Sequence, residues 1–157
     1  MIRRRTLWTA LVGGLVGLAV TGVALAQMSK PGSGDVIADR QRLMKLNGGS
    51  WRDAQDKLKA GNIEAIVVNA ETMAINAQHI TSLFPQGSTS DKSAAKPEIW
   101  QKWSEFEGAA KNMETWAVKL REAAKSKNGD EVQAIAKDFG KNACGTCHTP
   151  FRVPPKQ

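Results

Sequence analysis

One apolar seam constrains the fold of this 157-residue chain more than any other feature. After Pro97, apolar residues recur in alternating steps of four and three at Ile99, Trp103, Phe106, Ala110, Met113, Ala117, Leu120 and Ala124. A helix brings such positions onto one face, and a strict alternation of these steps is typical of helices that cross at a shallow angle. Pro97 suits a first helical turn and Asn128-Gly129 a helix end. We therefore predict a long helix between them, packed in a bundle.

Two earlier segments also have helical spacing, and no segment of the mature chain shows the period-two alternation of a strand. The first covers 35–47 and is expected to be interrupted at Gly48-Gly49, after which 51–59 either continues it or forms a short extension. The second covers 62–84, with Asn62 as its predicted N-cap.

A fourth helix is predicted to open at Asp130, where Gln133 completes the spacing of a capping box. It runs through Val132, Ile135 and Phe139 towards the C-terminus. Four amphipathic helices with three connections predict an all-α fold, an antiparallel four-helix bundle. The polar connection 85–96 either lies over a bound group or is a plain surface crossover.

Near its end the chain reads Cys144-Gly145-Thr146-Cys147-His148, the sequence that attaches a c-type haem. On a helix, two thiols three residues apart lie on one face, where each forms a thioether with a vinyl group of the same porphyrin. His148 then lies against the porphyrin with a ring nitrogen directed at the iron, and Gly145 leaves room for the ring. The motif predicts one haem c, bound covalently through Cys144 and Cys147.

Other uses of this motif find less support in the chain. A thioredoxin-like Cys-x-x-Cys follows a strand in a βαβ unit, whereas the residues before Cys144 have helical character. A structural zinc ion takes about four ligands, and His79 is the only other histidine. A helical redox or scaffold protein with a Cys144–Cys147 disulfide and no haem is a third interpretation. Colour that survives extraction with acidified acetone excludes it.

The N-terminal segment has the three parts of an export signal. Arg3-Arg4-Arg5 is a positive n-region, residues 6–23 carry no charge, and Ala24-Leu25-Ala26 is a cleavage site. We therefore predict a cleaved signal peptide over 1–26 and an exported, periplasmic protein. An uncleaved anchor is the alternative, because the uncharged stretch is nearly long enough to span a bilayer; its four glycines argue against it.

The predicted mature chain has a flexible lead-in over 27–34 and one domain over 35–157. The full chain has a formal net charge of +7, and removal of the leader takes away three basic residues and leaves +4. Two haem propionates reduce this further. Nucleic-acid binding is therefore not indicated, and no membrane contact is expected once the leader is removed.

The mature chain resembles the class II cytochromes c, the family of cytochrome c prime and its low-spin relatives. Four stretches carry the resemblance: the haem motif with Phe151-Arg152, Arg40-Gln41-Arg42-Leu43-Met44, Leu83-Phe84-Pro85, and Lys96-Pro97-Glu98-Ile99-Trp100. In this family the haem motif lies on the last helix of a four-helix bundle, in agreement with the helices predicted above.

The resemblance implies roles for individual residues. It makes Cys144 and Cys147 the covalent attachment points and His148 the proximal iron ligand. It also implies that Arg40 and Gln41 line the haem and meet its propionates.

Two departures from the family pattern lie near the same site. Ser93 stands where many members have a threonine and keeps a polar contact with the propionates, whereas Ala94 replaces an acidic residue. Arg152 matches a basic residue near the proximal histidine. Pro150 removes a helical hydrogen bond to Thr146 just before it.

In this family the position of Met44 faces the distal side of the iron. A methionine thioether there completes six-coordination in the low-spin members, whereas an apolar side chain in cytochrome c prime only crowds a five-coordinate iron. Met44 permits both, and the run Arg42-Leu43-Met44-Lys45 followed by Asn47-Gly48 looks more like the low-spin members. Met73 and Met113 lie on apolar seams and are predicted to fill the core.

The predicted function is that of a monohaem electron carrier with His148 and Met44 as iron ligands, which exchanges electrons with redox partner proteins. A five-coordinate iron that binds nitric oxide or carbon monoxide is the alternative. No enzyme is predicted, because His79 is expected at the surface or in helix packing and the chain has no tyrosine. The resemblance also allows a homodimer through the first two helices.

Overall fold

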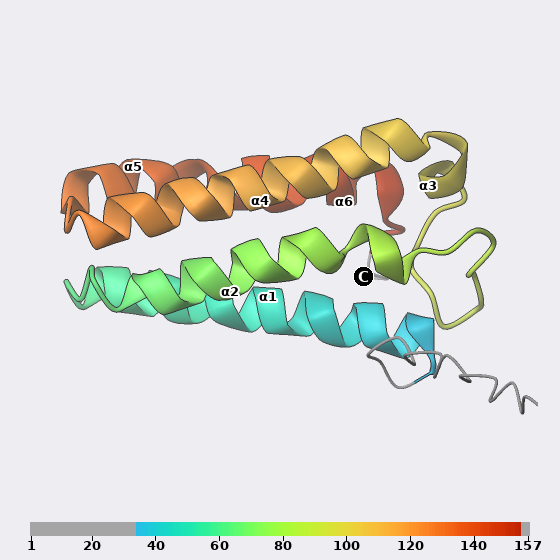
Figure 1. The fold of residues 1–157 in the computed structure, drawn as a ribbon, viewed down its shortest axis with the longest axis horizontal. Helices are drawn as coiled ribbons and strands as arrows, with labels where there is room; N and C mark the ends of the chain where they lie inside the picture. The colour runs from blue at the N-terminus through green and yellow to red at the C-terminus, as the bar shows by residue number, and fades with distance from the viewer. Residues whose placement is uncertain (1–33, 155–157) are drawn as a thin grey trace, which may run out of the picture. The chain divides into compact units, whose positions relative to one another are not determined.

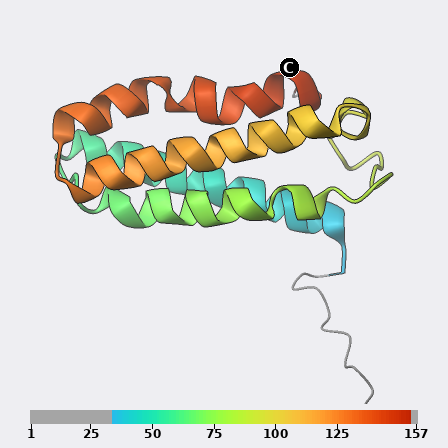
Figure 2. The same ribbon diagram turned by 45° about the horizontal axis from the view of Figure 1, so that its top comes forward.

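The computed structural model describes residues 34–154, and these form a bundle of four antiparallel helices (Figure 1). The long helices are α1 (Val36–Lys59), α2 (Ile66–His79) and α4 (Trp103–Lys125). The fourth is a composite of α5 (Gly129–Phe139), η2 (Gly140–Gly145) and α6 (Thr146–Phe151) (Figure 2). The predicted all-α four-helix bundle is confirmed. The predicted signal peptide and nearly all of the lead-in lie outside the described residues.

The first helix is unbroken, so the predicted interruption at Gly48-Gly49 is wrong. Asp35 caps its start by accepting hydrogen bonds from the N–H groups of Ile37 and Ala38. Gly61, at φ +72°, closes its end. A glycine inside a helix costs about 0.5–1 kcal/mol relative to alanine. Packing along 24 helical residues outweighs that cost.

The second helix is shorter than predicted. It begins at Ile66 rather than Asn62, whose N–H instead donates to the Lys57 carbonyl and completes the C-terminal cap of α1. It ends at His79, and a single 3₁₀ turn, η1 (Thr81–Leu83), follows. Asn62 is thus an end signal for one helix and not a start signal for the next.

The predicted third helix is divided at Lys102 into a short α3 (Glu98–Gln101) and the long α4. The residues of the seam are buried in the core except Trp103, which packs against it. The helix ends at Lys125, before the expected Asn128-Gly129, and Lys127 takes the left-handed closing position at φ 57°. Asn128 instead caps α5, with its side-chain oxygen accepting from the Glu131 N–H. The predicted Asp130/Gln133 capping box does not form this start.

Within the described residues, α2 and α4 make the most extensive contact between helices. Small side chains from both helices are buried, at Ala70, Ala74, Ala77, Ala109, Ala110, Ala117, Ala123 and Ala124. Met73 and Met113 are buried among them, as predicted for core methionines. Within residues 34–154 no helix is both long enough and apolar enough to cross a membrane.

Candidate haem site

The composite fourth helix carries the cysteine motif across a change of helix type. Cys144 lies in the π-helical η2, whereas Cys147 and His148 lie in α6. A π turn leaves backbone groups without their usual partners. Here the Asn142 carbonyl accepts from the Asn112 side-chain amide and from the Thr146 hydroxyl. The expected continuous α-helix into the motif is therefore replaced by a π-helical insertion anchored to α4.

Two adjoining cavities open beside this motif. The outer one has a volume of about 720 Å³, within the usual size range of ligand pockets. The inner one has about 110 Å³, and its lining includes Trp51, which stacks on Phe139 at 4.4 Å between ring centroids. Met44 from α1 and His148 from α6 line both cavities. The structure thus brings the two candidate iron ligands to one space between the first and last helices.

The eight residues singled out from the sequence all border these cavities. Seven line the outer one and Cys144 lines the inner one, and the seven are Arg40, Gln41, Met44, Ser93, Cys147, His148 and Arg152. Part of the crossover 85–96 lines the outer cavity as well, so it is more than a surface connection. It is held there by backbone hydrogen bonds between Ala94, Lys96 and the end of α6.

The two thiols are largely shielded from solvent. Burial raises the pKa of Cys144, and burial followed by the nearby Cys144 raises the pKa of Cys147 to about 11. Among the residues that the structure describes, no three His, Cys, Asp or Glu side chains gather as a metal site.

The surroundings of His148 favour its neutral imidazole. Burial, with a smaller contribution from the charge of Arg152, lowers its pKa. A neutral ring nitrogen is the form that binds iron. His148 therefore presents to the cavity an imidazole that can bind the iron of a haem.

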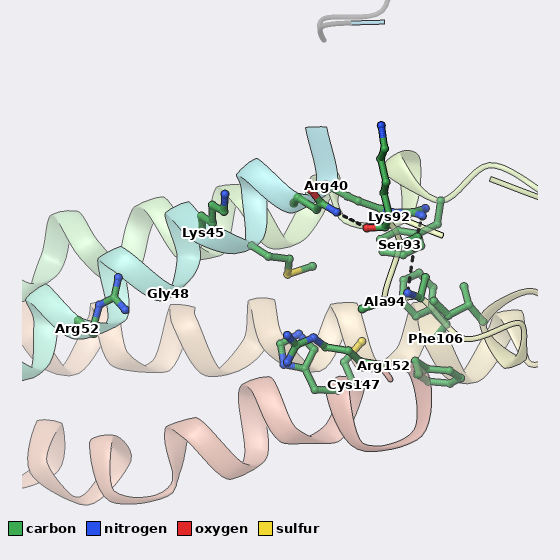
Figure 3. Close-up of a pocket in the computed structure, with 17 residues that line it drawn as sticks. Arg40, Lys45, Gly48, Arg52, Lys92, Ser93, Ala94, Phe106, Cys147 and Arg152 are labelled. Atoms are coloured by element: carbon green, nitrogen blue, oxygen red, sulfur yellow. Dashed lines mark hydrogen bonds between the residues drawn. The ribbon is translucent and has the colours of Figure 1, made fainter. Parts of the chain in front are cut away.

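Arg40 ties the crossover to the first helix (Figure 3). Its guanidinium donates to the Ser88 hydroxyl and carbonyl, at 3.1 and 2.7 Å, and to the Ser93 hydroxyl at 2.6 Å. It also lies 4.6 Å from the centre of the Phe84 ring. Gln41 donates to the Lys92 carbonyl. With 4% of its surface exposed, Arg40 has a pKa lowered mainly by burial.

The chemistry of the outer cavity fits a haem. Its inner wall is apolar, with Phe84, Ile99, Phe106 and Phe151. Five basic side chains and no acidic one line it, and the five are Arg40, Lys45, Arg52, Lys92 and Arg152. A porphyrin has an apolar ring and two anionic propionates, so both parts find complementary surroundings. Cys147 borders both cavities and Cys144 borders the inner one, so both cysteines adjoin the space proposed for the porphyrin.

Sequence reasoning missed several lining residues. Lys45 and Arg52 lie on the exposed side of α1, and Lys92 lies in the crossover, where charged residues are ordinarily unremarkable. Asn47, in the inner cavity, is 6% exposed and its side-chain N–H group has no hydrogen-bond partner among the described residues. A helical-wheel projection of α1 places Asn47 beside Met44, which is the signal that could have identified it.

Comparison with known proteins agrees with this geometry. A sequence profile described as Cytochrome C' matches residues 35–152. Cytochrome c-556 from Agrobacterium tumefaciens (strain II Chrys) is 29% identical over 121 residues, which cover 74% of this chain and 96% of that protein. Cytochrome c-554 from Cereibacter sphaeroides is 37% identical over 73 residues, 45% of this chain and 46% of the relative.

Solved structures show the same fold. Cytochrome c prime from Shewanella frigidimarina aligns with a TM-score of 0.70 at 22% identity, covering 80% of this chain and all of the other. The nitric oxide complex of a leucine-to-alanine mutant of cytochrome c prime from Alcaligenes xylosoxidans aligns at 0.69 and 23% identity, covering 78% and 96%. With the profile match over three-quarters of its length, the chain belongs to the cytochrome c' family of class II cytochromes c and carries a covalently attached haem c.

Proposed function

We propose that this protein is a one-electron carrier whose iron is held between His148 and Met44. The observation that carries the proposal is that both side chains line both cavities, one from α6 and one from α1. Met44 packs partly buried against the core, which limits its freedom to swing away. An iron with two fixed axial ligands changes oxidation state with little rearrangement, and a methionine ligand raises its potential.

The haem supplies the reversible one-electron chemistry, and the chain supplies its surroundings. Cys144 and Cys147 hold the porphyrin edge, and burial keeps the His148 imidazole neutral for ligation. Arg152 and Ser93 border the outer cavity, where the carboxylates of the group are expected to meet polar partners. The aromatic rings of Phe84, Phe106 and Phe151 would give the bound haem a low-dielectric surrounding.

Arg40 and Gln41 are proposed to act from the same side. The guanidinium of Arg40 already donates hydrogen bonds to the Ser88 and Ser93 hydroxyls in the crossover. Its burial makes an additional anionic partner favourable, since an ion pair offsets the desolvation that lowers its pKa. We therefore infer that Arg40 joins one propionate to the crossover.

Gas binding is the second candidate function. The solved relatives include nitric oxide complexes of cytochrome c prime from Alcaligenes xylosoxidans. The inner cavity is almost entirely apolar in its lining, which suits a small uncharged diatomic molecule next to the iron. This function requires that Met44 stay unbound or be displaced.

The ferric absorption and electron paramagnetic resonance spectra of the holoprotein decide between these functions. Ligation by Met44 gives a low-spin signal with a sulfur-to-iron charge-transfer band, and the band is lost in Met44→Ala. A high-spin ferric spectrum at neutral pH, with ready carbon monoxide binding after reduction, overturns ligation and favours gas binding.

Two other buried methionines provide matched controls. Met73 and Met113 line the inner cavity together with Met44. Met73→Ala is expected to keep the charge-transfer band while it lowers the free energy of unfolding by about 2–5 kcal/mol, because Met73 is 1% exposed. Loss of the band in Met73→Ala or Met113→Ala, but not in Met44→Ala, assigns the ligand to the other residue.

We also infer that the protein is exported and acts without enzymatic turnover. Members of the cytochrome c' family are typically periplasmic and serve as electron carriers or gas binders. Mass spectrometry of the mature protein tests the export signal, with cleavage after Ala26 expected. A homodimer through the first two helices remains a prediction, supported by the exposed Leu46, Val68 and Ile75 on α1 and α2.

A further inference from the structure

We propose that four exposed cations around the outer cavity form a docking surface for a partner protein with an acidic electron-transfer face. This surface, here termed the basic rim, consists of Lys45 and Arg52 on α1, Lys92 in the crossover and Arg152 after α6. The proposal rests on the proposed function, since the partner exchanges electrons with the haem. It goes further by naming the surface and the charge of that partner.

The four rim cations share two properties: none forms an ion pair among the described residues, and all line the outer cavity. Eight of the seventeen lysines and arginines in residues 34–154 form ion pairs, namely Arg42, Lys57, Lys59, Lys102, Lys111, Arg121, Lys125 and Lys127. Each rim residue belongs to the remaining nine. The other five are Arg40, Lys96, Lys119, Lys137 and Lys141, so the lack of an ion pair does not by itself define the rim. The rim is distinguished because its four cations line one cavity that has no acidic residue in its lining.

Haem binding leaves most of this charge in place. Two propionates offset two positive charges, whereas five basic side chains line the cavity. Arg40, the fifth, is buried and bonded to the crossover, so it faces inward. Asp91 precedes Lys92 in the chain and subtracts one charge from that side. The mouth of the cavity therefore remains positive in the holoprotein.

The position of the rim favours a protein over a lipid surface. Figure 3 shows Lys45 and Arg52 along α1, with Lys92 on the crossover and Arg152 across the cavity. The haem fills the cavity, so these cations surround the group that exchanges electrons. A redox protein can exchange an electron with the haem there, whereas a bilayer neither gives nor takes one. Opposite charges steer such a partner and raise its association rate by about 10–10³-fold at low salt.

Two small oxidants of opposite charge test the sign of the field at the haem. Hexacyanoferrate(III), an anion, takes one electron from the reduced holoprotein and becomes hexacyanoferrate(II). Tris(phenanthroline)cobalt(III), a cation, also takes one electron and becomes the cobalt(II) complex. Raising the ionic strength from 0.01 to 1 M shortens the screening length from about 30 to about 3 Å. We expect the anion rate to fall about tenfold over this range and the cation rate to rise.

Charge reversal then locates the field. In Lys45→Glu/Lys92→Glu the slope of the anion rate against salt is expected to flatten or reverse. Lys119→Glu/Lys137→Glu is the matched control: both residues are exposed, lack ion pairs among the described residues and line neither cavity. The control changes net charge equally and is expected to keep most of the slope. Equal effects of the two double variants overturn the proposal in favour of net charge alone.

Peptides and vesicles separate the kinds of partner. Hexa-aspartate is expected to inhibit anion reduction by the holoprotein and to lose that effect in the rim variant, whereas hexa-lysine is without effect. A different result would overturn the protein partner and assign the rim to a lipid surface. In that result the holoprotein binds phosphatidylserine vesicles through Lys45 and Lys92, and hexa-aspartate does not inhibit anion reduction. The ferric spectrum reports ligation separately, so a high-spin result contradicts the proposed carrier while the salt slopes still report the rim.

Discussion

The two sides of this bundle are built by opposite rules. Where α2 meets α4, alanines such as Ala70 and Ala117 allow close approach and leave no exposed surface at either residue. Where α1 faces α6, large and charged side chains border a cavity of about 720 Å³. Dense packing of small residues stabilises one side, and space for a ligand is kept on the other. The closed side holds the helices in place so that the open side can bind.

Replacing the two cysteines that attach the haem should have the largest effect, and this effect should be confined to the open side. In Cys144→Ser/Cys147→Ser we expect complete loss of covalent haem, because no thioether can form. Acidified acetone then extracts all haem colour from the protein. Far-ultraviolet circular dichroism is expected to show that the helices persist, since α2 and α4 keep their contacts. Colour that still resists extraction contradicts attachment through these cysteines.

Enlarging a residue on the closed side should come next. Ala70→Leu is expected to lower the free energy of unfolding by about 1–3 kcal/mol, because Ala70 has 0% exposure and no space for three more carbons. Urea denaturation of the holoprotein measures this. Ala60→Leu, at the exposed end of α1, is the control and should change little. An unchanged urea midpoint for Ala70→Leu would contradict close packing between α2 and α4 at this residue.

Adding a methyl group within α1, the helix that borders the open side, should change stability in the opposite direction. A side chain at Gly49 would meet nothing within 4 Å, and the residue lies inside α1. Gly49→Ala is therefore expected to raise the free energy of unfolding by about 0.5–1 kcal/mol, since alanine restricts the unfolded chain and favours the helix. The same urea titration measures it. Destabilisation by this change indicates that the residue contacts the haem or a second subunit.

The smallest expected effect is a pH-dependent change in stability at Asp53, where α1 is hydrogen-bonded to Asn69 of α2. Hydrogen bonds from Lys57 and Asn69 lower the pKa of Asp53 from its usual 3.8. A carboxyl group whose pKa is lower in the folded state than in the unfolded state stabilises the fold at pH values above the unfolded pKa. This stabilisation is lost as the pH falls through the folded pKa. Asp53→Asn is therefore expected to melt slightly lower than wild type at pH 7 and at the same temperature near pH 2. A difference that persists in acid assigns the effect to packing.

Much of the closed side was predictable from the sequence, because its seam repeats over many turns and each turn adds evidence of the same face. The haem motif was equally plain, since two thiols and a histidine have fixed spacing. Helix ends were harder: Asn62 and Asn128 each fit several capping roles, and the choice depends on which turn packs. Of the rim residues, Arg152 was identified through the family resemblance, whereas Lys45, Arg52 and Lys92 were not predictable. A cavity arises from the distance between helices, and a single helix carries no record of that distance.

The π-helical segment from Gly140 to Gly145 has a consequence for changes in chain length. A π turn holds about one residue more than an α turn, so α6 emerges about 100° out of phase with α5. This phase keeps Phe139 and Ala143 in the core while Cys147 reaches the cavity. Deletion of one codon here restores an ordinary helix and rotates the thiols away. A chain shortened by one residue before Cys144 would keep its attachment sequence but would turn His148 away from Met44.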